Sequence, residues 1–265
     1  MCAEQESRKL SNSKKRRQRA KKQNTMTSNT PIYPHGNVEE IAEDLFMLRG
    51  SIKMNPLLRI TRNMGVIRNG DELSLINPLR VNEKVEAQLA KLGKIKHIVR
   101  LGCFHGVDDP YYVEKFGAQM WAQPGGTTYT VPKIDKDLDS VAPLPFDNAE
   151  IFEFAGTIQP ECALLINRGR GTLFTCDAIQ NYGDYSYNNL PAKIVMPFIG
   201  FPRATLVGPI WLKRQTQEGE SLEPEFRRLL ELKFDRLLAA HGTLLETGAY
   251  AAVERAVDKA FERKK

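Results

Sequence analysis

The sequence lacks the features that mark membrane-spanning and disulfide-rich secreted proteins. It contains no run of about 18 apolar residues, and its start lacks the apolar stretch of a secretory signal. Its four cysteines include no C-x-x-C pair and are too few for a disulfide framework in 265 residues. We therefore expect no membrane partner, a reducing, cytoplasmic location, and free thiols that are mostly buried.

Excess positive charge is absent from most of the chain. The net charge is +6, but residues 1–25 hold nine of the 38 Lys and Arg residues and two of the 32 Asp and Glu residues. The rest of the chain therefore carries 29 basic against 30 acidic side chains, which lacks the basic surface expected for phosphate contacts. Nucleic acid is a partner only through the tail, if at all.

The segment KKRRQRAKK (14–22) has almost no apolar residue to bury, so it is predicted to be disordered. It is either a solvated tail without a partner, a phosphate-binding segment or a nuclear localisation signal. Translation from Met26 would remove it. We assign residues 1–37 to a disordered basic tail and linker, which ends in the Pro-rich TPIYPHGN, and residues 38–265 to one domain.

Beyond the linker, hydrophobic patterns predict both strands and helices. Helical spacing of apolar residues predicts helices at 81–93, 223–242 and 248–264, although the end of the 223–242 segment, DRLLAAHG, equally fits a strand. Pro in the first turn and Gly at the end predict a further short helix at 109–117. Residues 123–150 are predicted to be mostly loop, and the aromatic stretch 181–220 to be irregular, either a binding loop or packing beneath one. Strands are predicted at 44–50, 57–70, 72–78, 97–102, 118–123, 149–156 and, with a turn at NRGRG, 161–177.

Histidine is scarce, so each of the four can be considered separately. His35 and His97 are isolated, and we expect structural or solvent-facing roles for them. His105, Asp177 and His241 each follow a short apolar segment, where a strand ends and ligands commonly bind. Imidazole and carboxylate are ligands that Zn²⁺, Mn²⁺ and Fe²⁺ accept. With a further carboxylate near the first histidine, the predicted metal ligands are His105, Asp109, Asp177 and His241.

The order of these motifs resembles the metallo-β-lactamase-fold superfamily over roughly residues 38–262. The shared features are a hairpin-rich start, a His/Asp motif before a helix, LFTCDA (173–178), and AAHG (239–242) before a terminal helix. Members carry H-x-H-x-D-H, a further histidine, an LFTGDA-like strand and a late GHG. The resemblance implies an α/β fold, a four-layered αβ/βα sandwich whose two sheets hold one or two metal ions at their rim.

Two motifs match the family closely. Asp177 takes the position of the metal-bridging aspartate, with Cys176 where glycine is usual, and His241 takes that of the last metal-ligating histidine. The first motif matches in part, since His105 and Asp109 fit its first histidine and its aspartate.

Other ligand positions depart from the pattern. Val107 and Pro110 occupy two histidine positions of the first motif. The third motif's histidine is absent from FAGTIQPECALL (154–165), where Glu161 is the only ionisable candidate besides Cys162. With three ligands missing, the resemblance predicts a degenerate and mononuclear site.

These observations leave two functional interpretations. The first is a metal-dependent hydrolase of a small molecule with an ester, thioester or related bond, in which one Zn, Fe or Mn ion activates water and Asp109 ligates the ion or orients the water. The second is a non-catalytic protein that binds no metal and uses the same pocket for a ligand or partner. Two further alternatives are a Cys103/His105 nucleophilic pair and an Asp177 that only forms a turn.

Overall fold

The structure is a computed structural model that describes residues 30–262. Cys2 and the predicted disordered basic segment lie outside the described residues. The end of the predicted linker contacts strand β2 (Leu45–Lys53): the Ser51 hydroxyl donates to the Pro34 carbonyl at 2.8 Å. Within the described part of the chain, no helix has the length and apolar character needed to cross a membrane.

The first sheet has seven strands in sequence order, antiparallel from β1 to β4 and parallel from β4 to β7. Helices provide the crossovers that parallel pairing requires between β4, β5 and β6. The strands are β1 (Glu39–Ala42), β2, β3 (Arg59–Asn69), β4 (Glu72–Ile76), β5 (Lys94–Arg100), β6 (Gln119–Ala122) and β7 (Lys136–Asp137), and the crossover helices are α2 (Glu83–Leu92) and α3 (Asp109–Phe116).

The ends of these two helices follow from local sequence. The Asn82 side chain accepts a hydrogen bond from the Val85 amide and so caps the start of α2. Pro110 lies in the first turn of α3, and Gly117 ends that helix in a left-handed conformation with φ 62°.

The second sheet has four strands in the order β13-β10-β9-β8. β10 pairs parallel with β13 and antiparallel with β9, which in turn pairs antiparallel with β8. A separate pair, β11 with β12, lies beyond the end of β10 in the chain. The bounds are β8 (Ala149–Glu153), β9 (Cys162–Ile166), β10 (Thr172–Thr175), β11 (Ile179–Asn181), β12 (Thr205–Val207) and β13 (Arg236–Ala239).

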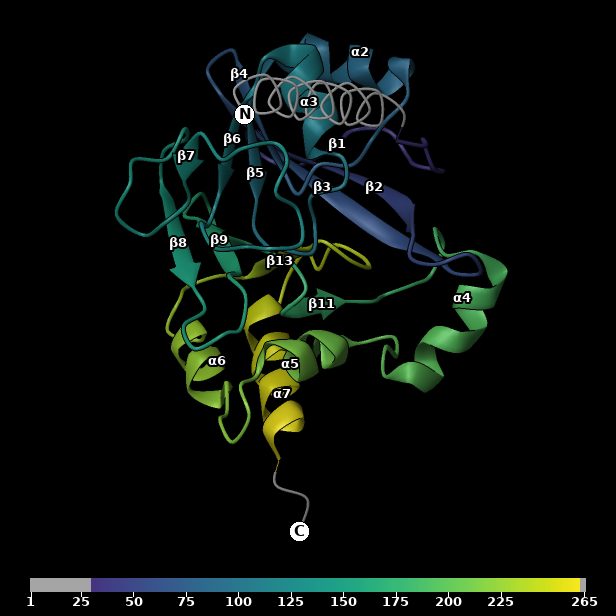
Figure 1. The fold of residues 1–265 in the computed structure, drawn as a ribbon, viewed down its shortest axis with the longest axis vertical. Coiled ribbons are helices and arrows are strands. Elements are labelled where there is room, and N and C mark those ends of the chain that lie inside the picture. Colours follow the sequence, from purple (N-terminus) through teal and green to yellow (C-terminus); the bar gives the residue numbers. More distant parts are fainter. Residues whose placement is uncertain (1–29, 263–265) are drawn as a thin grey trace, which may run out of the picture. The chain divides into compact units, whose positions relative to one another are not determined.

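Three of the four buried clusters of the described residues lie between the layers of helices and strands. Figure 1 shows these helices and strands. Alternate residues of β2 divide between two of them: Phe46 packs beneath α2 and α3, whereas Met47 faces the second sheet. The cluster between the sheets joins Ile67 and Val99 of the first to Phe174 of the second. A third cluster joins the outer face of the second sheet to α5 (Pro209–Gln215), α6 (Glu223–Leu229) and α7 (Ala249–Phe261). The predicted four-layered αβ/βα sandwich is confirmed.

Residues 181–220 differ from their predicted irregularity. They contain β12, α5, the helix α4 (Leu190–Val195) and the 3₁₀ turn η1 (Met196–Ile199). Each element is too short to produce a recognisable apolar period, and Pro191 and Pro209 stand in the first turns of α4 and α5. The ambiguous DRLLAAHG forms strand β13, because α6 ends before it.

Candidate metal centre

Strand pairing brings two of the predicted ligands together. β10 and β13 are parallel neighbours with Thr175 opposite Ala239. Asp177 and His241 each follow two residues later, so both lie at the same edge of the second sheet. His105 approaches from the first sheet, in the loop between β5 and α3. The site therefore lies where one rim of each sheet meets the other, as the resemblance implied.

His241 is held by strand β3. Its Nδ1 lies 2.7 Å from the Thr61 carbonyl oxygen, and because a carbonyl only accepts, Nδ1 carries the hydrogen. In the neutral imidazole, the lone pair is then on Nε2, which faces the other two residues. Asn63 fixes the loop before His241. Its side-chain amide donates to the Ala239 carbonyl at 2.7 Å, and its backbone N–H donates to the Ala240 carbonyl at 2.8 Å.

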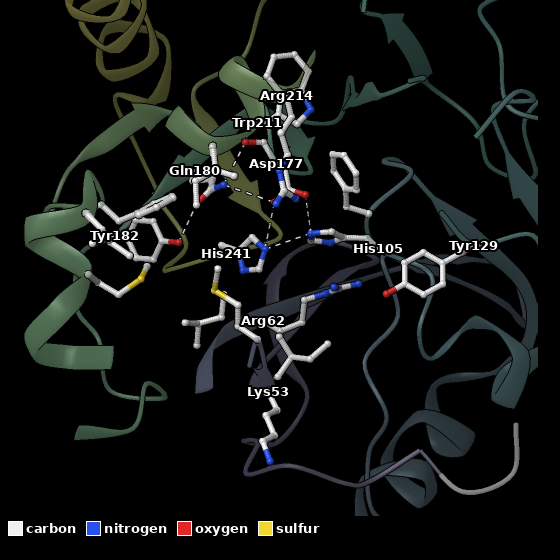
Figure 2. Close-up of a pocket in the computed structure, with 18 residues that line it drawn as sticks. Lys53, Arg62, His105, Tyr129, Asp177, Gln180, Tyr182, Trp211, Arg214 and His241 are labelled. Carbon is white, nitrogen blue, oxygen red and sulfur yellow. Dashed lines mark hydrogen bonds and ion pairs between the residues drawn. The ribbon is translucent and has the colours of Figure 1, made fainter. Parts of the chain in front are cut away.

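The metal-ligating groups of three residues, two imidazoles and one carboxylate, converge (Figure 2). His105 Nε2 lies 3.0 Å from Asp177 Oδ2 and 3.1 Å from His241 Nε2, and His241 Nε2 lies 3.2 Å from Asp177 Oδ1. Zinc bonds of about 2.0–2.1 Å at tetrahedral angles place ligand atoms roughly 3.3 Å apart. The spacing and chemistry of these donors thus fit one ion.

Electrostatics favour the forms that bind metal. Burial, assisted by the positive charge of Arg62, lowers the pKa of His105 to about 3, so its imidazole is neutral near pH 7. Burial acts to raise the pKa of Asp177, but its contacts with the two histidines outweigh burial and hold that pKa well below its usual range. A neutral imidazole and an ionised carboxylate need lose no proton to a metal.

The structure does not bring Asp109 into this group. Asp109 is fully buried at the start of α3, its Oδ2 lies 3.4 Å from Arg100 Nη1, and it is not among the residues that line the adjacent pocket. This differs from the expectation for a metal ligand or catalytic base. The physical reason is that the loop after β5 turns His105 toward Asp177, while Asp109 begins a helix that packs on the first sheet.

Glu161, in the stretch where the third motif's histidine is missing, takes a supporting position. Its carboxylate accepts hydrogen bonds from Trp211 Nε1 at 2.8 Å and from the Ala178 amide at 2.6 Å, directly after Asp177. Burial and the charge of Asp177 raise its pKa well above the usual value. Glu161, Cys176 and Asp177 form a second close group of ligand atoms, but burial also raises the pKa of the Cys176 thiol well above its ordinary value.

The remaining cysteine alternative is not favoured. The three cysteines in the described residues, Cys103, Cys162 and Cys176, are free and buried, as expected. Burial raises the pKa of Cys103 to about 12, so it carries little thiolate near pH 7. Its Sγ accepts a hydrogen bond from the Gln215 side-chain amide at 3.7 Å.

A cavity of about 270 Å³ opens onto the three converging residues. Its wall combines apolar side chains with polar ones, among them Arg62 and Gln180 (Figure 2). We did not predict Arg62 from the sequence. A signal was present, because Thr61, Arg62 and Asn63 place three consecutive polar residues between Ile60 and Met64; in the structure all three are 2% exposed or less.

Comparisons with known proteins agree with this architecture. No family model matches the sequence, and no curated protein matches it. Among solved structures, a metallo-β-lactamase from Erythrobacter litoralis is 14% identical with a TM-score of 0.56, covering 88% of this chain and 96% of its own. The mono-zinc form of the metallo-β-lactamase FIM-1 from Pseudomonas aeruginosa is 12% identical with a TM-score of 0.58, covering 88% and 99%. The chain has the metallo-β-lactamase fold, in a divergent sequence.

Proposed function

We propose that the protein is a metal-dependent hydrolase with one metal ion held by His105, Asp177 and His241. The observation that carries this proposal is the convergence of two imidazole nitrogens and a carboxylate oxygen within 4.8 Å of one another, at the wall of a pocket. The fold supports it, because this sheet rim is where the family resemblance places metal. The mononuclear form follows from the missing family ligands.

Each residue of the group has a defined role in this proposal. A bound ion supplies Lewis acidity and lowers the pKa of water toward neutrality. The two histidines hold the ion through Nε2, and Thr61 fixes the orientation of the His241 ring. The Gln180 amide donates to the Asp177 carbonyl at 3.1 Å and is itself fixed by the Tyr182 hydroxyl at 2.8 Å, which limits movement of the loop that carries the carboxylate.

The pocket favours a small substrate. Its volume of about 270 Å³ is near the lower end of the range for ligand sites, roughly 300–1,000 Å³. Apolar side chains, including Ile60, Phe104 and Trp211, line the cavity and offer apolar contacts to a bound molecule. An ester or thioester of a small acid matches both the volume and the wall.

One observation favours the non-catalytic alternative. Asp177 already contacts both histidines at hydrogen-bond distance, so protons alone are able to hold the group together. In that case the protein binds a ligand in the same pocket without hydrolysing it. The two proposals differ in metal content.

Elemental analysis of the purified, tag-free protein tests the proposal. We expect about one equivalent of Zn, Fe or Mn in the wild type and in Asp184→Asn, a carboxylate control away from the site, and loss of the metal in Asp177→Ala and His241→Ala. Metal-loaded wild type is then screened with small esters and thioesters. Absence of bound metal after reconstitution, in protein that remains folded, would eliminate the hydrolase and leave the binding protein.

A further inference from the structure

Arg62 is a buried cation with two donor atoms that lack a hydrogen-bond partner among the described residues. Its side chain lies in the wall of the pocket, on β3, and the residue is 2% exposed. Among the residues that the structure describes, neither its Nε nor its Nη2 has a hydrogen-bond partner. Burying an unpaired charged donor is costly, so such a group is expected to have a partner in the functional state.

The two unpaired atoms belong to one edge of the guanidinium. Nε–H and the adjacent Nη2–H point in nearly parallel directions, which is the geometry that binds both oxygens of a carboxylate or phosphate. Lysine, a point charge on a flexible stem, does not reproduce this fork. Both atoms are buried, so Arg62 presents this edge to an oxyanion when its side chain turns toward the cavity that it lines.

The nearby carboxylates do not fill this role. Asp109 lies 3.4 Å from Arg100, and Asp177 is engaged by the two histidines. Neither of these two carboxylates forms an ion pair with Arg62, although the charge of Arg62 also acts to lower the pKa of Asp109. The charge of Arg62 is nonetheless felt at the site, since it helps to lower the pKa of His105.

Other pocket residues define the rest of the ligand. Lys53 and Arg214 also line the cavity (Figure 2) and add positive charge. Ile60, Met196 and Phe201 offer apolar surface. We propose that the pocket binds a small organic oxyanion, a carboxylate or phosphate on an apolar body, through the Nε–Nη2 edge of Arg62. The inference rests on the proposed function only in assigning this anion to a substrate or product of hydrolysis.

Calorimetric titration of the full-length protein tests this inference with three probes of one chain length: hexanoate, hexyl phosphate and the neutral hexanamide. Titrations are run on protein treated with EDTA, in which no metal can bind the anion, and on zinc-loaded protein. We expect at least one oxyanion to bind metal-free wild type about 10-fold or more tightly than hexanamide. The oxyanion that binds more tightly, hexanoate or hexyl phosphate, identifies the head group that the pocket prefers.

Variants locate the binding. Arg62→Gln and Arg62→Lys are expected to weaken oxyanion binding by about 10-fold or more, because the first removes the charge and the second the fork. Arg59→Lys, on the same strand but outside the pocket lining, is the matched control and should retain it. Circular dichroism verifies that each variant is folded.

The outcomes separate this inference from the hydrolase proposal. If neither oxyanion binds metal-free wild type more tightly than hexanamide, or if folded Arg62→Gln retains full affinity, the inference is wrong even where zinc binds. If zinc does not bind but Arg62-dependent oxyanion binding persists, the inference stands and the hydrolase proposal fails. Should both Arg62 variants unfold, the comparison of the three probes on wild type still decides.

Discussion

Asp109 shows how burial sets the behaviour of a single side chain. Its two carboxylate oxygens have no hydrogen-bond donor among the described residues, and burial raises its pKa from the ordinary 3.8 to about 7 despite the nearby guanidinium of Arg100. Sequence spacing placed Asp109 four residues after His105, as in the family motif, but spacing along a chain does not determine which way a side chain points once a helix begins.

This pKa predicts a pH-dependent stability. The folded protein binds the Asp109 proton more tightly than the unfolded chain does, so this contribution to the free energy of unfolding is complete below about pH 4 and is lost as the pH rises toward 7. The loss is on the order of 4 kcal/mol at most. The Asp109→Asn variant has no titrating side chain at this position, so its free energy of unfolding lacks this pH dependence.

Urea unfolding of both proteins at pH 5 and pH 8 measures the effect. We expect Asp109→Asn to gain stability relative to wild type as the pH rises. An equal pH dependence in the two proteins would mean that Asp109 is ionised in the fold and paired with Arg100.

At the scale of elements, the segment before α4 stabilises the site through strand β3. Asn188 is buried, and its Oδ1 accepts hydrogen bonds from the Thr61 amide at 2.8 Å and the Thr61 hydroxyl at 2.9 Å. The carbonyl of the same threonine accepts from His241. Asn188 is therefore a positioning residue that acts on the histidine through β3.

Asn188→Ala removes the acceptor and leaves the Thr61 amide unpaired in a buried position. We expect it to lower the free energy of unfolding by about 1–3 kcal/mol and to weaken zinc binding by up to about 10-fold. Chemical denaturation and a competitive zinc titration measure the two effects.

Asn189→Ala is the matched control. Asn189 caps α4 by accepting from the Ala192 amide at 3.2 Å, and it also accepts from the Arg59 amide of β3 at 3.2 Å and donates to the Leu57 carbonyl at 2.8 Å, but it makes no hydrogen bond with Thr61. Its loss should therefore cost about 1–3 kcal/mol with no change in zinc affinity. Equal zinc affinities of wild type and Asn188→Ala would contradict the positioning role.

The same comparison of elements explains which structure was predictable. Helices α2 and α3 were found within two residues of their bounds, because they have apolar spacing, an Asn cap or Pro at the start, and Gly at the end. Strand β13 was ambiguous, because a strand of four residues, three of them buried, satisfies either the helical or the strand period. The short elements β12, α4 and α5 are fixed by tertiary packing rather than by local pattern.

For the whole domain, the layers were predictable from the family resemblance but the partners within the site were not. The parallel pairing of β10 with β13 joins segments about 60 residues apart, and it is this pairing that brings Asp177 beside His241. Arg62 reaches the same pocket from the other sheet. No local sequence pattern predicts which distant residues will lie together. The two histidines and Asp177 were therefore predicted from the sequence, but Arg62, which lines the same pocket, was not.

Because the site joins residues from both sheets, an ion bound there should stabilise the whole fold. A ligand that binds only the folded protein adds about 2.7 kcal/mol at a concentration 100 times its Kd, which for a domain of this size raises the Tm by roughly 5–10 °C. We expect zinc to produce this rise in wild type, EDTA to reverse it, and Asp177→Ala to show no rise. Differential scanning calorimetry at fixed protein concentration measures it. A similar rise in Asp177→Ala would place the zinc elsewhere on the chain, whereas no rise in wild type would mean that protons, not metal, hold the two sheets together at this rim.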